Sequence, residues 1–469
     1  MEIRLYNTLG RRRQIFKPIK ADRIGIYSCG PTVYGNQHIG HMYAYVQWDV
    51  LVRFLRFLDF KVRWVMNITD VGHLTGDNLG DADTGEDKME KGARREGLTV
   101  WQIAEKYIQQ FLESADFLNI TRPDILCRAS RHIKEQIDLA KRIEDNGFTY
   151  RTKTGLVFDT AKFPDYARFA RLDLKKQRAG ERVEVDPEKK QPWDFLLWVT
   201  NQPEHIMKWD SPWGVGFPGW HIECTAMSVK YLGKQFDIHT GGQEHIGVHH
   251  TNEIAQGHGA YGAQTANFWL HNGWLKLEGA KISKSLGNVI LVSDLIARGF
   301  DPLSLRYLIL TSHYRQGLDF TWEGLKAASR ALKRLRETVG SLKKTSRERS
   351  HLTADKLKKI EAWRQKFVGS LADDLAMPQA LASIWEMLKS NLTSYDKLDM
   401  LLDFDEVLGL DLAAVEEAEI PEKIRILAEK RQLLRKEKKW TEADKVRKEI
   451  ERSGFEVRDT GSSYWLRSK

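Results

Sequence analysis

The sequence has little cysteine, with only three residues, Cys29, Cys127 and Cys224, in a chain of 469. Three scattered cysteines cannot form a disulfide framework, so each is either a buried small apolar residue or a ligand. The sequence also lacks any run of about 18 uncharged apolar residues, which a membrane-spanning helix needs. Its first residues lack the basic segment and apolar core of a secretory signal. We therefore expect a cytoplasmic protein that does not enter a membrane.

The composition excludes a wholly disordered or fibrous chain, because 42% of the residues are hydrophobic and 29% are charged, as in ordinary soluble proteins. At about 150 residues per domain, the length indicates about three domains. Lys and Arg number 73 against 64 Asp and Glu, which gives a formal net charge of +9. This excess favours an anionic partner such as nucleic acid or a phosphorylated substrate, and a mildly basic surface without such a partner is the alternative.

A strand–helix–strand pattern lies near the N-terminus. Residues 23–29 form a short apolar run that predicts a buried strand, residues 42–60 carry apolar side chains at helical spacing, and residues 62–69 predict a second strand. These elements make a right-handed βαβ unit, in which ligands bind at the carboxyl ends of the strands. Cys29 and Thr69 are both expected at that edge.

The remaining chain differs in character from one segment to the next. The region from 122 is rich in Lys and Arg and suggests an insertion, the block 220–275 is strand-rich with dense Gly and His usage, and the chain from 322 is helical and charged. We therefore predict an α/β protein with a Rossmann-type parallel sheet. Its predicted segments are 1–121 and 205–258 for the two halves of the catalytic domain, 122–204 for the insertion, 259–321 for a region with a lysine motif, 322–405 for a helical bundle, and 406–469 for a small C-terminal domain.

The first motif with chemical potential is His38-Ile39-Gly40-His41, between the first strand and its helix. We expect the two imidazoles at positions i and i+3 of the first helical turn, on one face. Unpaired backbone N–H groups and the positive end of the helix dipole point there too, which suits a polyphosphate, and Gly40 lets such a ligand approach the backbone. Two ordinary capping histidines are the alternative.

The second motif, from Lys281 to Asn288, follows the Gly-rich segment 277–280 and reads K-I-S-K-S-L-G-N. A flexible loop with two ammonium groups, those of Lys281 and Lys284, can close over phosphates and meet charge that develops in nucleotidyl transfer. Taken alone, the motif would more readily be interpreted as a solvated basic turn. Its occurrence some 240 residues after the histidine pair is much harder to attribute to chance.

H-I-G-H followed by K-I-S-K-S resembles the paired signature of class I aminoacyl-tRNA synthetases, which activate an amino acid with ATP and transfer it to tRNA. The second motif of that family usually reads K-M-S-K-S. Ile282 takes the place of the methionine, which exchanges one apolar side chain for another and leaves both lysines in position.

Two further segments could complete a metal site with the first cysteine. Cys224 lies in G-W-H-I-E-C, and His249 and Glu253 lie at i and i+4 of a predicted helix, so Cys29, Cys224, His249 and Glu253 together would suit tetrahedral zinc. A buried free cysteine with surface histidines is the alternative. The same segments resemble the cysteinyl-tRNA synthetase family, in which zinc holds the substrate thiolate, and the likeness extends from residues 5–9 through 29–34 and 311–315 to the C-terminal helices.

This resemblance implies a set of site residues. The zinc ligands would be the four just named, and one zinc ion and Mg²⁺ with ATP would be the cofactors. Catalysis would rest on His38, His41, Lys281 and Lys284. Cysteine would contact Gly30, Thr32, Thr69 and Trp220, and ATP would contact His38, Gly40, His41, Gly241, Gly242, Glu244, Lys281, Ser283 and Lys284.

The sequence departs from the family pattern at two places. The family commonly reads N-I-T-D-I-D-D after the second strand, whereas this chain has Val71-Gly72-His73 after Asn67-Ile68-Thr69-Asp70. The usual aspartate at position 244 is glutamate, whose longer side chain changes how a ribose contact could be made. His73 and His245 add two imidazoles near the expected site.

The C-terminal stretch 421–469 has fifteen Lys and Arg against nine Asp and Glu, so it carries +6 of the chain's +9. Predicted helices at 421–435 and 441–452, followed by aromatic and basic residues at 455–458 and 464–467, suit the recognition of single-stranded RNA. A solvated helical face is the alternative. In the family this region reads the tRNA anticodon, so the resemblance implies tRNA(Cys), ATP and L-cysteine as partners of a monomeric enzyme.

Three other functions are compatible with parts of this pattern. A ligase that joins cysteine to an amino sugar would share the zinc and ATP sites but lack the C-terminal module, which the basic C-terminus argues against. A non-catalytic RNA-binding paralogue would have lost activation, whereas both signatures and all four candidate ligands are intact. A zinc hydrolase is disfavoured because the pattern H-E-x-x-H is absent.

Overall fold

The computed structural model describes residues 1–71, 87–172, 187–282, 288–345, 353–415, 421–460 and 463–468. These residues form two compact units. The first consists of Met1–Ser329, Trp363–Trp385 and Glu406–Leu410, and the second of Arg330–Ala362, Glu386–Asp405 and Asp411–Lys469. Among the described helices, none combines the length and the apolar character that crossing a membrane requires.

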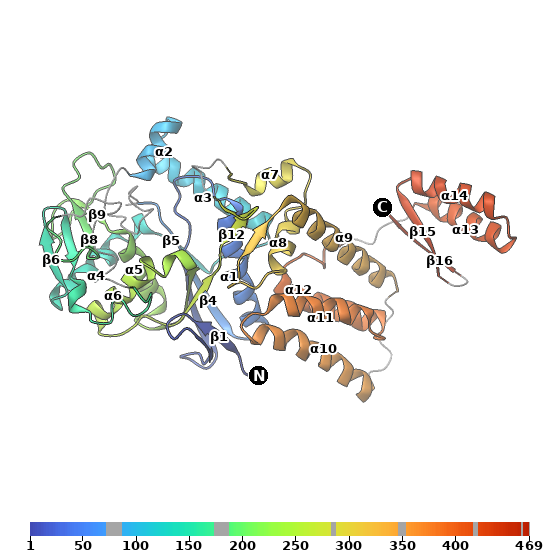
Figure 1. Ribbon diagram of the computed structural model, residues 1–469, viewed down its shortest axis with the longest axis horizontal. Helices are drawn as coiled ribbons and strands as arrows, with labels where there is room; N and C mark the ends of the chain where they lie inside the picture. The colour runs from blue at the N-terminus through green and yellow to red at the C-terminus, as the bar shows by residue number, and fades with distance from the viewer. Residues whose placement is uncertain are drawn as a thin grey trace. The chain divides into compact units, whose positions relative to one another are not determined.

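A five-stranded parallel sheet in the order β11-β10-β3-β4-β5 is the centre of the first unit. Its strands β4 and β5 are labelled in Figure 1. The predicted strand–helix–strand unit is present: α1 lies between β3 and β4 along the chain and packs on the sheet against β4 and β10. This arrangement confirms the predicted α/β fold. The elements of this core are β3 (Arg23–Ser28), α1 (Ile39–Phe57), β4 (Lys61–Ile68), β5 (Ile125–Arg128), β10 (Phe236–Gly242) and β11 (Ala266–Asn272).

The block 220–275, predicted to be strand-rich, contributes β10 and β11 to the sheet but also contains two helices. These are α5 (Trp220–Leu232) and α6 (His249–Tyr261). The second helix arises because β10 and β11 are parallel, and parallel neighbours need a crossover connection, usually a helix. α6 provides that connection, and α5 and α6 pack against each other (Figure 1).

Three strands from the predicted insertion 122–204 and a fourth strand, β9, from beyond it form a separate four-stranded antiparallel sheet in the order β6-β7-β8-β9. Aromatic side chains pack on it, and the rings of Phe158 and Phe195 stack with centroids 5.0 Å apart. The elements here are α4 (Ile133–Asp145), β6 (Thr149–Thr152), β7 (Gly155–Phe158), β8 (Phe195–Thr200) and β9 (Gly216–Pro218).

The other elements of the first unit surround the parallel sheet. A three-stranded sheet in the order β13-β12-β14 follows β11 along the chain and includes Lys281 at the end of β13. These elements are β1 (Arg4–Asn7), β2 (Arg12–Ile15), α2 (Lys88–Glu96), α3 (Val100–Phe117), β12 (Leu275–Leu277), β13 (Ala280–Lys281), α7 (Val292–Ala297), α8 (Leu303–Leu310) and β14 (Leu318–Phe320).

A fully buried arginine holds helix α1 in its place. Arg306 of α8 donates to Asp49 Oδ2 of α1 over 2.6 Å, and to the carbonyl oxygens of Leu118 (2.9 Å) and Leu408 (2.6 Å). The guanidinium therefore satisfies carbonyls at the ends of two other helices and a buried carboxylate at the same time. Beside Asp49, burial opposes ionisation, but the charges of Arg306 and Arg53 outweigh it and hold the pKa of that carboxyl below its usual value.

From Trp322 the chain is mainly helical, as predicted. The long helices are α9 (Trp322–Thr345), α10 (Ala354–Ala372), α11 (Met377–Lys389) and α12 (Ser394–Leu408). The last part of the chain has a core of its own, formed by Ile424, Ala428, Val446, Ile450 and Val457. It is built from α13 (Glu422–Lys436), α14 (Trp440–Arg452) and the antiparallel pair β15 (Phe455–Thr460) and β16 (Ser463–Ser468).

Candidate active site

The carboxyl ends of the parallel strands bring the predicted site residues together. Cys29 directly follows β3, Thr69 directly follows β4, and Gly241 and Gly242 end β10. Thr32 and Thr69 form a β-bridge just beyond the strands. Because parallel strands end at a common edge, residues that are over 200 positions apart in the sequence meet there.

The histidine pair is placed differently from the prediction in one respect. Helix α1 begins at Ile39, so His38 is its N-cap and not a residue of the first turn. The backbone of His38 is extended (φ −86°, ψ 170°), and its Nδ1 accepts the Gly40 N–H over 3.1 Å. His41 Nδ1 in turn accepts the His38 N–H, and the two rings stack with centroids 3.7 Å apart. Both imidazoles thus stand at the helix N-terminus, where the helix dipole attracts anions.

The two signature motifs lie against each other. A Cβ built on Gly40 would lie 3.4 Å from Cδ1 of Ile282, the residue that replaces the usual methionine. The Ile39 N–H, at the start of α1, donates to the Ile290 carbonyl over 2.9 Å. Ile282 in the lysine motif and Ile290 just after it therefore both lie at the N-terminus of the helix that carries the histidines.

The lysines themselves are described only in part. The backbone of Lys281 ends β13, which pairs with β12. Ser283 and Lys284 lie outside the described residues, as does His73.

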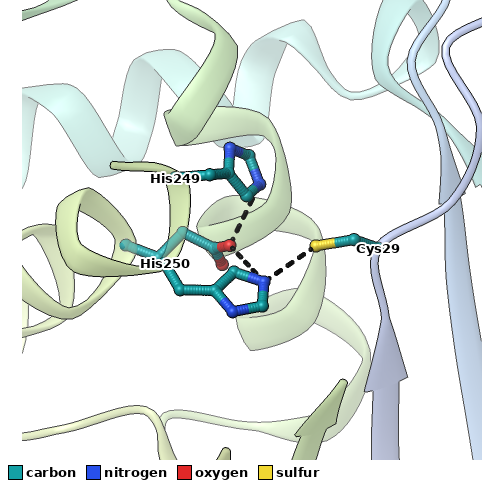
Figure 2. A group of neighbouring side chains, drawn as sticks. Cys29, His249 and His250 are labelled. Atoms are coloured by element: carbon teal, nitrogen blue, oxygen red, sulfur yellow. Dashed lines mark hydrogen bonds and ion pairs between the residues drawn. The ribbon is translucent and has the colours of Figure 1, made fainter. Parts of the chain in front are cut away.

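A buried group of four side chains could hold a metal ion. Ligand atoms of Cys29, His249, His250 and Glu253 all lie within 4.8 Å of one another (Figure 2). Cys29 comes from the loop after β3, and the other three come from the first turns of α6. The Nε2 atom of His249 lies 3.1 Å from Glu253 Oε1, as the i, i+4 spacing predicts. Three of the four predicted ligands are thus in one group, and the fourth, Cys224, is near it.

Cys224 lies on α5 and is also buried. Burial raises the pKa of its thiol, but close interactions with Cys29 and with His249 outweigh burial and lower that pKa to about 7. The same neighbourhood has the opposite effect on Cys29, whose pKa is raised by burial and by Cys224. The two thiols are therefore adjacent, and Cys224 reaches the group from a third element.

The donor set fits a bound cation on two grounds. Glu253 is 1% exposed. Although His249 Nε2 lies 3.1 Å from its Oε1, this oxygen accepts no well-aligned hydrogen bond among the described residues. Burial raises the pKa of this carboxyl well above its usual value. A divalent cation among these atoms would supply the missing positive charge, and two thiolates, an imidazole and a carboxylate are ordinary ligands for such an ion.

His250 was not assigned a role from the sequence, although it lies beside a predicted ligand. Its Nε2 is 3.3 Å from Cys29 Sγ, and its Nδ1 is 2.7 Å from His271 Nε2. His271 Nδ1 is 2.8 Å from the Thr8 hydroxyl. Burial lowers the pKa of both histidines well below the usual value, so each ring is neutral and has one donor and one acceptor. Donation in either direction along this chain, between the Thr8 hydroxyl and Cys29, satisfies every bond. With Cys29 as a thiolate, the chain runs from the Thr8 hydroxyl through both rings and ends with an N–H directed at the sulfur.

Trp220 and Thr69 flank this group. The indole of Trp220, the first residue of α5, lies 4.4 Å from the His249 ring between centroids. Thr69 donates to Glu223 Oε2 over 2.9 Å, and Asn67 donates to Thr69 over 3.0 Å. Glu223 is a buried carboxyl that sequence reasoning did not assign, and the available signal was its position next to Cys224.

Glycines let the backbone approach closely at this edge. A Cβ on Gly30 would lie 1.7 Å from the Asn67 carbonyl oxygen, so only glycine fits between β3 and β4 there. A Cβ on Gly241 would lie 2.6 Å from His245 Nδ1 and 2.7 Å from His250 Cε1. His245 is therefore next to the candidate metal group, as expected, although it is not one of the four clustered residues.

Comparison with known proteins decides the family. Residues 15–330 match the family described as tRNA synthetases class I (C) catalytic domain. A cysteine–tRNA ligase 1 of Burkholderia lata is 45% identical over 465 residues, which cover 98% of this chain and 96% of the relative. The chain belongs to the cysteine–tRNA ligase family of class I synthetases.

Other family members match over the same extent. The cysteine–tRNA ligase of Treponema denticola is 42% identical over 99% of both chains, and that of Thermus thermophilus is 40% identical over 98% of both. This extent includes the C-terminal region, so the full chain resembles a cysteine–tRNA ligase and not its catalytic half alone.

A solved structure supports the fold at greater distance. Methionyl-tRNA synthetase of Mycobacterium tuberculosis, in complex with methionyl-adenylate, superposes with a TM-score of 0.59 at 16% identity. The match covers 84% of this chain and 93% of that chain. The superposition thus supports the class I fold. The family match and the relatives named above show that the chain is an aminoacyl-tRNA synthetase.

Proposed function

We propose that the protein activates L-cysteine with ATP and transfers it to the 3′ end of tRNA(Cys). The observation that carries this proposal is the convergence of Cys29, Cys224, His249 and Glu253 at the strand edge, beside the two signature motifs. The family relatives named cysteine–tRNA ligase support the same substrate.

In the first step, a carboxylate oxygen of cysteine attacks the α-phosphorus of ATP, the α–β phosphoanhydride bond breaks, and pyrophosphate leaves. The N-terminus of α1 with His38 and His41 suits the ATP phosphates, and Mg²⁺ accompanies the nucleotide. Lys281 and Lys284 would meet the charge that develops as the bond breaks. No covalent enzyme intermediate is required, so these groups act by position and charge. In the second step, a ribose hydroxyl of the terminal tRNA nucleotide attacks the carbonyl carbon of the adenylate, an ester bond forms as the acyl–phosphate bond breaks, and AMP leaves with release of the hydroxyl proton.

The metal is proposed to be zinc, held by Cys29, Cys224, His249 and Glu253. When bound, zinc supplies a soft Lewis acid that takes a thiolate far better than a serine hydroxyl. An apolar pocket alone separates such near-isosteres by only about 1–3 kcal/mol, which would call for a separate editing step. Trp220 would pack against the bound amino acid, and Gly30, Thr32 and Thr69 would line its other side.

His250→Gln is expected to weaken zinc binding by roughly 10–100-fold, the usual scale for losing a group that orients a ligand. The substitution removes the ring that joins Cys29 to His271 while leaving the four proposed ligands in place. Competition with a chelator measures the affinity without any turnover. His258→Gln, on the same helix and away from the group, is the matched control. Equal zinc affinity in His250→Gln and the unaltered chain would show that the histidine chain does not orient Cys29.

The C-terminal part of the chain is proposed to bind tRNA. Its core is complete in itself, which leaves its charged side chains for solvent and ligand. Arg435 stacks over the ring of Trp440, whose side chain is exposed, and such pairs also stack on unpaired bases. We further propose the domain limits given above, a cytoplasmic location and a monomer.

Removal of residues after Val415 is expected to leave cysteine-dependent pyrophosphate exchange intact and to lower tRNA charging roughly tenfold or more, a loss of about 1.4 kcal/mol or more. The cut is placed there because the predicted limit 405/406 falls inside α12, and Arg306 and Asn119 use the carbonyls of Leu408 and Gly409. Initial rates of charging against tRNA concentration measure the loss. Binding of tRNA to the intact chain should also weaken as salt rises.

A truncated chain that charges tRNA as well as the intact one would remove the proposed role of the C-terminal part. An intact chain that shows no salt-dependent tRNA binding but joins cysteine to an amino sugar with ATP would establish the alternative ligase.

A further inference from the structure

The glutamate at position 244 does not extend freely from its loop. Glu244 lies in the short turn after β10, and its carboxyl group folds back over Gly242. A Cβ built on Gly242 would lie 2.2 Å from Glu244 Oε1 and 2.4 Å from Oε2. The side chain is therefore retracted toward its own backbone, which offsets the methylene by which it exceeds aspartate.

Trp274 provides the contact that keeps the carboxyl there. Its indole Nε1–H donates to Glu244 Oε2 over 2.9 Å, although both side chains are exposed. Burial does not explain the position of an exposed tryptophan, and its indole N–H is a donor only. The bond is charge-assisted, so it is among the stronger kinds.

The backbone beneath the indole is fixed. The Gly273 N–H donates to the Tyr314 carbonyl over 2.7 Å, and the Leu318 N–H donates to the Trp274 carbonyl over 3.0 Å. Gly317 has φ +78°, and a Cβ there would lie 2.3 Å from the Trp274 carbonyl oxygen. The indole thus projects from a tightly packed turn, immediately before the β12–β13 hairpin that ends at Lys281.

We propose that Trp274 is a positioning residue that holds Glu244 for the ribose of ATP. The inference rests on the proposed function, since it assumes that the turn after β10 holds the nucleoside. A carboxylate has two oxygens: the indole occupies Oε2, and Oε1 accepts a hydrogen bond from a ribose hydroxyl. The indole holds the Glu244 side chain in one rotamer, whereas a free glutamate side chain samples many rotamers. ATP binding therefore does not have to restrict the Glu244 side chain.

The pair also links two parts of the site. Glu244 belongs to the nucleoside side, whereas Trp274 immediately precedes the β12–β13 hairpin, which ends at the first signature lysine. A ribose that engages Glu244 therefore engages a group tied to that hairpin. A deoxy analogue of ATP that lacks the hydroxyl donating to Glu244 gains no binding affinity from the Glu244–Trp274 pair.

The test is equilibrium binding of ATP, 2′-deoxy-ATP and 3′-deoxy-ATP without cysteine, so that it needs no turnover. The unaltered chain should bind ATP more tightly than at least one deoxy analogue. Trp274→Phe keeps an aromatic ring but removes the N–H, and it should weaken ATP binding roughly three- to tenfold, in line with the loss of one hydrogen bond to a charged group at an exposed site. The preference over the deoxy analogue should fall by the same factor.

Three comparisons sharpen this result. Trp101→Phe, an exposed tryptophan on α3, is the matched control and should change nothing. In a Glu244→Ala background, which leaves the indole N–H no side-chain acceptor at this position, Trp274→Phe should cause little further loss, because the two residues act as a unit. In pyrophosphate exchange, Trp274→Phe should raise the KM for ATP with kcat and the KM for cysteine unchanged.

Unchanged ATP binding in Trp274→Phe would overturn the inference, and so would an equal loss for ATP and both deoxy analogues. A failure of the proposed function is a separate result: the chain would then show no cysteine-dependent exchange, while the ratio of ATP to deoxy-ATP binding still decides the role of Trp274.

Discussion

Cys224→Ser is expected to lose most of its zinc and to lose its selection of cysteine over serine. A serine hydroxyl is a hard ligand with a high pKa, so the variant offers the metal three good ligands instead of four. The thiol of Cys224 already has its pKa lowered to about 7 by its neighbours, which favours the thiolate that a metal takes. Metal analysis of the purified protein gives the zinc content, and pyrophosphate exchange with cysteine and serine gives the selectivity.

Cys127→Ser is the matched control. Cys127 on β5 is buried, donates weakly to the Met66 carbonyl over 3.4 Å, and has its pKa raised to about 12 by burial and by the nearby Cys224. It is therefore a neutral thiol that is not one of the clustered residues. It should retain full zinc and full selectivity. Full zinc and unchanged cysteine activation in Cys224→Ser would remove Cys224 from the ligand set.

Lys284→Ala is expected to slow adenylate formation by about 2.7–4 kcal/mol, the scale for losing one preorganised donor in a transition state. The affinity for cysteine should change little, because the lysine would act on charge that forms only as the α–β bond breaks. Lys284 lies outside the described residues, but the neighbouring Ile282 packs at Gly40, beside the histidine pair. Single-turnover measurement of adenylate formation isolates the chemical step.

Lys276→Ala serves as the control for charge alone. Lys276 is an exposed lysine of β12, on the same hairpin, and its removal should leave the rate within a factor of about two, as for most surface substitutions. A wild-type rate of adenylate formation in Lys284→Ala would make Lys284 an ordinary surface lysine.

The sequence predicted the parts of the site that rest on local pattern. The apolar run before Cys29, the helical stripe after His41 and the run before Thr69 specify β3, α1 and β4 because each needs only its own periodicity. The i, i+4 spacing of His249 and Glu253 likewise required only a helix. The limit of this reasoning shows at His38, where the helix begins one residue later than expected because the side chain caps it.

Contacts between distant segments could not be predicted in this way. Thr8 and His271 are 263 positions apart, and nothing in either local pattern indicates their hydrogen bond. The same holds for Arg306, whose partners lie on three other segments, and for the retraction of Glu244 toward Trp274. These contacts depend on how the sheet, the hairpin and the helices pack, which periodicity does not specify.

The most direct test of the central claim is ATP–pyrophosphate exchange by the intact zinc-loaded chain with cysteine and with serine at matched concentrations. Rapid exchange is expected with cysteine and almost none with serine, because a metal held by Cys29, Cys224, His249 and Glu253 selects the thiolate. Equal exchange with the two amino acids, or none with cysteine, would contradict it.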